Sequence, residues 1–143
     1  MGLGLNRYDA SLAGNPRLVL HRAANLLIDF IRILIYSCDQ MKRIFFLDDT
    51  LDQIRSFPLK ARSDAGSELR RVQMGLDPMD WKPMKTIGAG IREIRLRDGA
   101  GAFRVIYVLN SGDAIYVLNA FHKKTQKTPK HELELAARRL KLM

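Results

Sequence analysis

The sequence predicts a small α+β domain in the order β-α-α-β-β-β-α, with a mostly antiparallel sheet and its helices packed on one face. Two patterns support this fold: apolar residues recur at helical spacing in three segments, and after residue 90 the period changes to two, with alternation over residues 92–97 followed by two more segments between short turns. The length of 143 residues suits one compact domain better than two. We therefore expect the second face of the sheet to be free to bind a partner.

A strand and two helices are predicted in the first half of this domain. Residues 42–47 have the composition of a short strand, and residues 48–50 offer Asp and Thr side chains that can cap a helix over residues 51–57. A second apolar stripe at helical spacing covers residues 59–72, and Gly75 stands where that helix should end.

A three-stranded meander and a last helix are predicted in the second half. Residues 76–90 contain prolines and glycines and are expected to form a loop. Residues 92–97, 103–109 and 114–121 predict three antiparallel strands, because short turns rich in Gly, Asn, Asp and Ser separate them. A helix capped by Thr128 follows and reaches the C-terminus.

The N-terminal segment, residues 1–40, is expected to be an extension of the domain formed by residues 41–143. Residues 17–36 carry apolar side chains at helical spacing and predict an amphipathic helix, but polar residues interrupt them too often for a membrane span. No signal-peptide pattern precedes this helix. Either the helix packs on the domain, or Met41 is the functional start and the extension lies upstream of it.

The charge favours a polyanionic partner. Lys and Arg number 24 against 15 Asp and Glu, a net charge of +9 that lies almost entirely in residues 41–143. Nucleic acid is the first expectation and an anionic membrane surface the second. The one cysteine, Cys38, can form no internal disulfide and has no His/Cys cluster to complete a usual zinc site, so we expect a cytoplasmic protein without a metal or cofactor.

Arginines on the predicted strands are candidate phosphate contacts. Arg95 and Arg97 lie two apart on one strand, so both project from one face about 7 Å apart, which is close to the spacing of successive phosphates. Arg104 stands on the neighbouring strand. Lys85 lies in the loop before the sheet, where a flexible ammonium can meet a phosphate. The alternative is a solvated charged face with no ligand.

The densest cationic segment, residues 121–129, lies between the last strand and the last helix. His122 begins this cluster, and its imidazole titrates near neutral pH, so it is a candidate general acid or base. The neighbouring Lys123 and Lys124 should favour its neutral form. The alternative is a histidine at a strand end with no catalytic role.

Four sequence blocks carry a resemblance to a known family. They are WKPMKTIG (81–88), IREIR (91–95), GAFRVIY (101–107) and FHKKTQKTP (121–129). In this order they resemble the phage-derived, HigB-like branch of the RelE/ParE toxin superfamily, whose members belong to type II toxin–antitoxin modules. The resemblance covers residues 41–143 and does not extend to residues 1–40.

The resemblance implies a RelE-like fold and a metal-independent endoribonuclease that cleaves messenger RNA in the ribosomal A site. It also implies a small helix-turn-helix antitoxin as partner. Lys85 looks like the loop lysine of RelE-type toxins, Arg97 like their strand arginine, and Lys124 like the basic residue after their last strand. The expected site residues fall into two groups: catalytic Lys85, Arg97, Arg104, His122 and Lys124, and RNA-binding Lys82, Arg95, Lys123 and Lys127.

One position departs from the family pattern. The tyrosine that RelE-type toxins carry early in the last helix has no counterpart in residues 128–132, where His131 is the residue that could substitute. Two other functions therefore stay open: a ParE-like inhibitor of DNA gyrase with the same fold, and a non-catalytic or decayed prophage protein that binds nucleic acid.

Overall fold

The computed structural model describes most of the chain, namely residues 24–32, 34, 41–110 and 113–143. By its internal contacts the chain divides into two units, Met1–Gln40 and Met41–Met143.

The first unit contains a helix. Residues 24–32 and 34 are helical, and the rest of the helix predicted over residues 17–36 lies outside the described residues. Six large apolar side chains of this helix are exposed to solvent: Leu26, Leu27, Ile28, Phe30, Ile31 and Leu34. None of the helices in the described part of the chain is long and apolar enough to cross a membrane.

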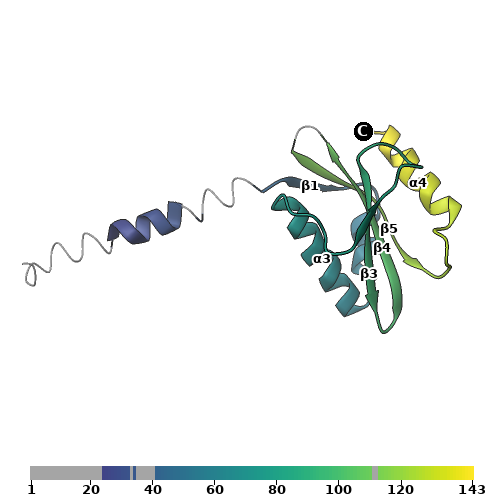
Figure 1. Ribbon diagram of the computed structural model, residues 1–143, viewed down its shortest axis with the longest axis horizontal. Coiled ribbons are helices and arrows are strands. Elements are labelled where there is room, and N and C mark those ends of the chain that lie inside the picture. Colours follow the sequence, from purple (N-terminus) through teal and green to yellow (C-terminus); the bar gives the residue numbers. More distant parts are fainter. Residues whose placement is uncertain (1–23, 33, 35–40, 111–112) are drawn as a thin grey trace, which may run out of the picture. The chain divides into compact units, whose positions relative to one another are not determined.

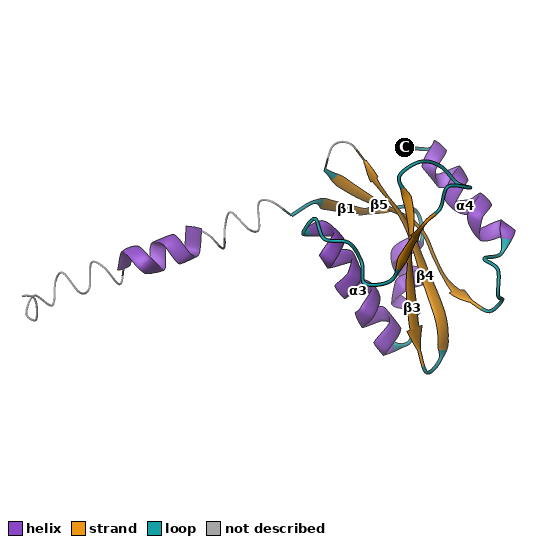
Figure 2. Ribbon diagram, viewed as in Figure 1, coloured by secondary structure: helices purple, strands orange, loops and turns teal. Residues whose placement is uncertain are grey.

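The second unit is an α+β domain, which confirms the predicted fold class (Figure 1). Its elements follow in the order β1 (Arg43–Phe46), α2 (Thr50–Arg55), α3 (Leu59–Gln73), β2 (Trp81–Pro83), β3 (Ile91–Asp98), β4 (Gly101–Asn110), β5 (Ala114–Lys123) and α4 (Lys130–Lys141). The strands form one five-stranded sheet in the order β1-β5-β4-β3-β2. Only β1 and β5 pair in parallel, and the other neighbours are antiparallel (Figure 2).

The sheet has one strand more than predicted. β2 lies inside the segment that was expected to be a loop, and it pairs with β3 through Trp81 and Ile94. Three residues at the edge of a sheet are too few for an alternating pattern, and Pro83 argues against a strand in general. An edge strand tolerates proline because its outer side needs no hydrogen-bond donor.

Helices cover both faces of the sheet, so the prediction that they share one face is wrong for α4. Helices α2 and α3 pack on one side against Val105, Tyr107 and their neighbours, whereas α4 packs on the other side against Ile106 and Leu118. Figure 1 shows α3 and α4 on opposite sides of the strands. A central strand buried on both faces has apolar residues at successive positions, and residues 105–108 of β4 have this pattern.

The larger core lies between the sheet and α2 and α3. Ala61, Ala65, Leu69 and Val72 form the buried stripe of α3, as the helical spacing predicts. Full burial of a Val or Leu side chain contributes roughly 1.5–3 kcal/mol to the stability of the fold. Gly75 ends the helix region with a φ of +79°, a conformation that favours glycine.

The helix starts differ from the predicted caps. Asp49 precedes α2 and Pro129 precedes α4, and neither makes a side-chain capping hydrogen bond. Thr128, the predicted cap of the last helix, instead donates its hydroxyl to a carboxylate oxygen of Glu93 on β3, at 3.3 Å. Thr128, two residues before α4, therefore links the start of this helix to the sheet.

Candidate functional site

Basic side chains gather on the α4 side of the sheet, at the end beyond the α4 core. Arg95 on β3 lies directly opposite Arg104 on β4. In the next row, Arg97 lies opposite Ala102, which lies opposite Lys123 on β5. Since residues two apart on a strand share a face, these four cations project from the same face of the sheet. Together with Lys82, which lies opposite Glu93, they form the cationic face.

Like charges directly opposite each other destabilise a sheet, so the Arg95–Arg104 pair needs counter-charges. Arg95 donates from Nε to Asp80 Oδ1 at 2.8 Å. Arg104 is buried, with 3% of its surface exposed, and its Nη1 donates to the Phe103 carbonyl at 2.8 Å. Its Nε lies 3.3 Å from Oε1 of Glu93. The two arginines are thus held apart by separate carboxylates and remain on one face.

Glu93 is the fully buried anion at the centre of these cations. Besides Arg104, it contacts Lys82, whose Nζ lies 3.6 Å from the same Oε1. Neither Glu93 Oε1 nor Arg104 Nε has a hydrogen-bond partner in the described part of the chain, so the pair interacts by charge without a well-formed hydrogen bond. Burying such a pair costs more than it contributes unless its geometry is good. This local cost is typical of functional sites.

The mutual influence of these charges appears in two pKa shifts. Burial, followed by the charge of Arg104, lowers the pKa of Lys123, and Lys82 and Arg95 act in the same direction. Burial also lowers the pKa of Arg104, against the opposing effect of Glu93. The neighbouring cations therefore add to the effect of burial on both pKa values while Glu93 opposes it, and a bound anion would reduce the repulsion between the cations.

A groove of about 470 Å³ runs beside the cationic face, between the β2–β3 connection and the segment before α4. Four of its lining residues are lysines: Lys82, Lys85, Lys123 and Lys127. We call it the cationic groove. It brings together predicted site residues from two separate segments of the sequence, residues 82–85 and 123–127.

Two further predicted site residues lie in the open. Arg97 near the end of β3 and Lys124 just after β5 are exposed to solvent. Arg97 belongs to the cationic face through its register with Ala102 and Lys123. Lys124 follows the last residue of the strand, so strand register does not assign it to a face.

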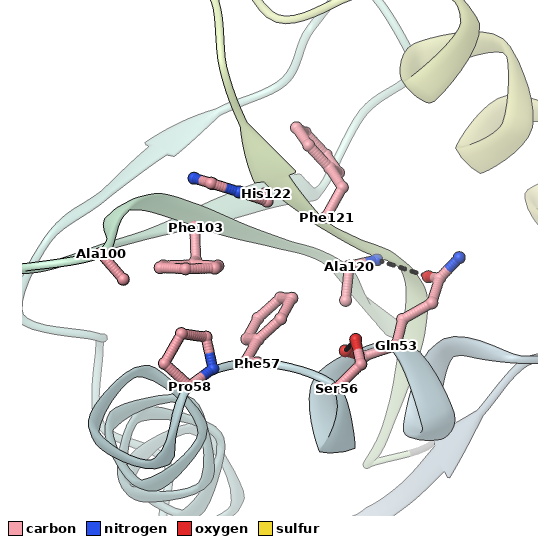
Figure 3. A pocket seen from close by; sticks show the side chains of 9 residues that line it. All are labelled: Gln53, Ser56, Phe57, Pro58, Ala100, Phe103, Ala120, Phe121 and His122. Carbon is pink, nitrogen blue, oxygen red and sulfur yellow. Dashed lines mark hydrogen bonds between the residues drawn. The ribbon is translucent and has the colours of Figure 1, made fainter.

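His122 lies on the other face of the sheet. It pairs with Phe103, a member of the α2 and α3 core, and the two rings stack at a centroid distance of 4.6 Å. Figure 3 shows His122 and Phe103 lining a groove together with Phe57 and Pro58. The histidine also lies close to Gly101, where a Cβ atom would come within 2.5 Å of Nε2. The structure therefore does not place His122 with Arg104 and Lys123.

His131, the possible substitute for the missing tyrosine, lies in the first turn of α4. Its side chain is 75% exposed, and Nε2 lies 3.2 Å from Glu132 Oε1. Among the described residues, no group of three His, Cys, Asp or Glu side chains could hold a metal ion.

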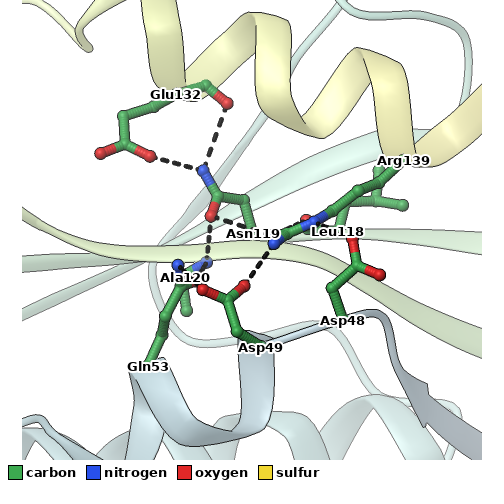
Figure 4. Close-up of polar contacts among 8 residues, drawn as sticks. All are labelled: Asp48, Asp49, Gln53, Leu118, Asn119, Ala120, Glu132 and Arg139. Atoms are coloured by element: carbon green, nitrogen blue, oxygen red, sulfur yellow. Dashed lines mark hydrogen bonds and ion pairs between the residues drawn. The ribbon is translucent and has the colours of Figure 1, made fainter.

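A network of polar contacts fixes α4 next to the cationic face (Figure 4). Arg139, which is buried, pairs with Asp48 through Nε at 2.9 Å and also with Asp49, both at the start of α2. Its Nη1 donates to the Leu118 carbonyl at 3.0 Å. Near the other end of the helix, Asn119 donates to the Glu132 carboxylate at 2.6 Å. These contacts hold both ends of α4 on β5.

Sequence reasoning did not find Glu93 as a site residue. Glu93 lies two positions before Arg95, so alternation along the strand predicts that both side chains share a face. The same alternation predicts that this face is exposed to solvent, which is wrong for Glu93. Its burial depends on α4 and Thr128, which are distant in the sequence. The arginines beside it in the sequence were the feature that could have indicated a counter-ion at this position.

Comparisons with known proteins concern the second unit. The family model described as Phage derived protein Gp49-like (DUF891) matches residues 52–141. Among solved structures, one similar chain is the E. coli toxin RelE in the free state, with two arginines replaced by alanine; it is 13% identical, with a TM-score of 0.52. The match covers 72% of this chain and 98% of that chain, and it shows a RelE-like fold. No curated protein sequence matches the chain at a significant level.

Proposed function

Because the chain belongs to the Gp49-like family of phage-derived proteins, we propose that it is the toxin of a type II toxin–antitoxin system and cleaves messenger RNA on the ribosome. The RelE-like fold supports this proposal, because the similar solved structure is that of a toxin. The expected place of action is the cytoplasm, and the expected antitoxin is a small helix-turn-helix protein.

The observation that carries the proposal is the cationic face with its single buried carboxylate. Arg95 and Arg97 are two residues apart on β3, and Arg104 and Lys123 continue the same face across β4 and β5. This spacing suits the successive phosphates of a single strand of RNA. The positive charge left uncompensated by Glu93 would be balanced when a phosphate binds.

RNA cleavage without a metal needs three events at one phosphate. The ribose 2′-hydroxyl loses its proton, the negative charge on the phosphorane is stabilised, and the leaving 5′-oxygen gains a proton. Arg104 supports the second event because its guanidinium is already held by backbone carbonyls, so little reorganisation is needed. Arg97 would add charge beside Arg104 from the exposed end of the face, and Lys85, at the other end of β3, would contact a different phosphate of the strand.

Lys123 is a candidate for proton transfer in this scheme. Its lowered pKa brings the ammonium closer to the range in which it can give a proton to the leaving oxygen. The catalytic role of His122 stays a prediction, and its place on the opposite face argues against direct contact with a phosphate held by Arg104. Lys124 and Lys127 would contact the RNA backbone.

The test is inducible expression of the full chain in bacteria, followed by growth measurement and primer extension on an abundant message. Lys85→Ala and Arg97→Ala should abolish both growth arrest and cleavage inside translated codons. Arg70→Ala is the matched control, because Arg70 is also exposed but lies on α3, on the other side of the sheet. The control should keep full activity.

Other outcomes identify the other functions. Growth arrest with DNA damage and no RNA cuts, unchanged by Lys85→Ala, would indicate a gyrase inhibitor. Absence of growth arrest from a folded, expressed protein would indicate a non-catalytic or decayed protein. Either result contradicts the endoribonuclease proposal.

A further inference from the structure

A second groove lies at the β2 edge of the sheet beside the cationic groove, and its Trp81 and Arg92 belong to the α2 and α3 face because they lie opposite Ile94 and Tyr107. It has a volume of about 500 Å³, and Trp81, Pro83, Lys85 and Arg92 line it together with the main chain of residues 88–90. Pro83 and Lys85 also line the cationic groove. The two grooves therefore meet at the β2–β3 connection, with Lys85 between them.

The wall of this second groove is an aromatic ring with a cation stacked on it. The Arg92 guanidinium lies over the Trp81 ring, with Cζ 4.2 Å from the ring centroid. Asp77 holds the guanidinium in place, with Arg92 Nη1 2.7 Å from Oδ1. A cation–π contact at an exposed site contributes about 0.5–1 kcal/mol. It accounts for the orientation of the Trp81 ring, but it is too weak to account for a partly exposed tryptophan at the edge of a sheet.

The chemistry of the groove suits a planar ligand attached to an anionic chain. An aromatic side chain offers a stacking surface to any nucleobase, and a nearby guanidinium adds to that attraction. Lys85 offers a charge at the point where the two grooves meet. A protein partner would not need this combination of a stacking surface and a continuous row of cations.

We propose that this groove is a nucleobase subsite, which takes one unstacked base of an RNA strand whose phosphates lie in the cationic groove. The proposal rests on the proposed function for the identity of the ligand, and it adds a base contact to the phosphate contacts. The base stacks on the Trp81–Arg92 pair, and Lys85 contacts the adjoining phosphate. Pro83 forms the rigid rim over which the strand turns.

Trp81 makes the test direct, because it is the only tryptophan of the chain. Tryptophan fluorescence of the full-length protein is titrated with a short single-stranded polyadenylate RNA, and binding is followed in parallel by anisotropy of labelled RNA. The control ligand is an abasic oligomer of the same length and charge. The RNA should quench the fluorescence to saturation, and the abasic oligomer should bind without comparable quenching.

Two variants sharpen the result without the fluorescence signal. Trp81→Ala should weaken RNA binding roughly tenfold, the scale of one lost stacking contact, with little effect on the abasic oligomer. Trp81→Phe keeps a stacking ring and should retain most of the affinity. It also serves as the folded reference if Trp81→Ala does not fold. Arg70→Ala, which removes one exposed charge of α3 that lines neither groove, should leave the quenching unchanged.

Results that overturn the base subsite can be distinguished from results that overturn the proposed function. Equal quenching by RNA and abasic oligomer, RNA binding without quenching, or absence of RNA binding overturns the base subsite. If codon-specific cleavage is still observed in cells, the endoribonuclease proposal survives that loss. Quenching without any cleavage in cells supports the base subsite and removes the enzymatic function.

Discussion

The same strands contribute a continuous apolar surface to one face of the sheet and a surface that is partly charged to the other face. On the α2 and α3 face, β3, β4 and β5 contribute Ile94, Phe103 and Val117 to a continuous apolar core. On the α4 face the same strands change from an apolar core to charged residues, with Arg104 and the buried Glu93 among them. We infer that apolar burial on the α2 and α3 face offsets the free-energy cost of the buried charges on the α4 face.

The largest effect is expected in the core of the α2 and α3 face. Ile94→Ala removes a fully buried side chain and should lower the free energy of unfolding by roughly 2–5 kcal/mol, through lost burial and the cavity that remains. Denaturant unfolding measures it. Activity per folded molecule should be unchanged, and a specific loss of activity in the folded protein would contradict the division of roles.

The reverse result is expected for Arg97→Ala on the cationic face. The exposed side chain contributes little to stability, so the unfolding midpoint should stay within the range of ordinary surface substitutions. Cleavage should fall by about 10²-fold if Arg97 stabilises the charged intermediate. Reconstituted translation with a defined message measures the rate. Activity within twofold of the original protein would remove Arg97 from the site.

Glu93→Gln should connect stability with anion binding. Removing the buried negative charge leaves Arg104 and Lys82 without their shared counter-ion, so the protein should lose roughly 1–3 kcal/mol of stability. Phosphate or RNA should restore more of the melting temperature in the variant than in the original protein. Equal responses of both proteins to phosphate would show that the cations are balanced in another way.

A smaller effect is expected from pH through Lys123. Because its pKa is lowered, this lysine loses its charge earlier as the pH rises, and RNA affinity should fall roughly two- to fivefold across that alkaline transition, the scale of one exposed charge contact. Lys123→Arg stays charged and should remove the early decline. Affinity measured against pH in both proteins tests it, and parallel curves would exclude Lys123 as the titrating group.

The smallest effect is expected from His122→Ala. Because the imidazole stacks on Phe103 on the α2 and α3 face, cleavage should change less than twofold once loss of stability is corrected for. Rate profiles against pH for the two proteins make the comparison sharper. Loss of a catalytic transition near neutral pH in the variant would restore His122 as an acid or base.

The local sequence pattern predicted an element well where the segment buries only one of its faces. The stripe of α3 from Ala61 to Val72 and the end near Gly75 agree with the structure. The apolar run of residues 105–108 contained the sign of a strand buried on both faces, yet the position of α4 over it depends on Arg139 and its partners at the start of α2. Such contacts between distant segments leave no local pattern.

The candidate site divides in the same way. Strand periodicity predicted that Arg95 and Arg97 share a face, and the register between strands then adds Arg104 and Lys123. The same periodicity separates His122 from Lys123, since neighbours on a strand point to opposite faces. Closeness in sequence within the cationic segment obscured that separation. The burial of Glu93 and the groove at Trp81 arise only when β2 and the segment before α4 meet the sheet.

The parallel pairing of β1 with β5 has a consequence for how the chain acquires its structure during synthesis. β1 is made well before its partner strand, which begins at Ala114. Pairings between such distant segments form late and slowly, because a long loop must close first. The rows that join Arg97 to Lys123 also require β5. A growing chain therefore carries its positive residues unassembled until β5 has been made.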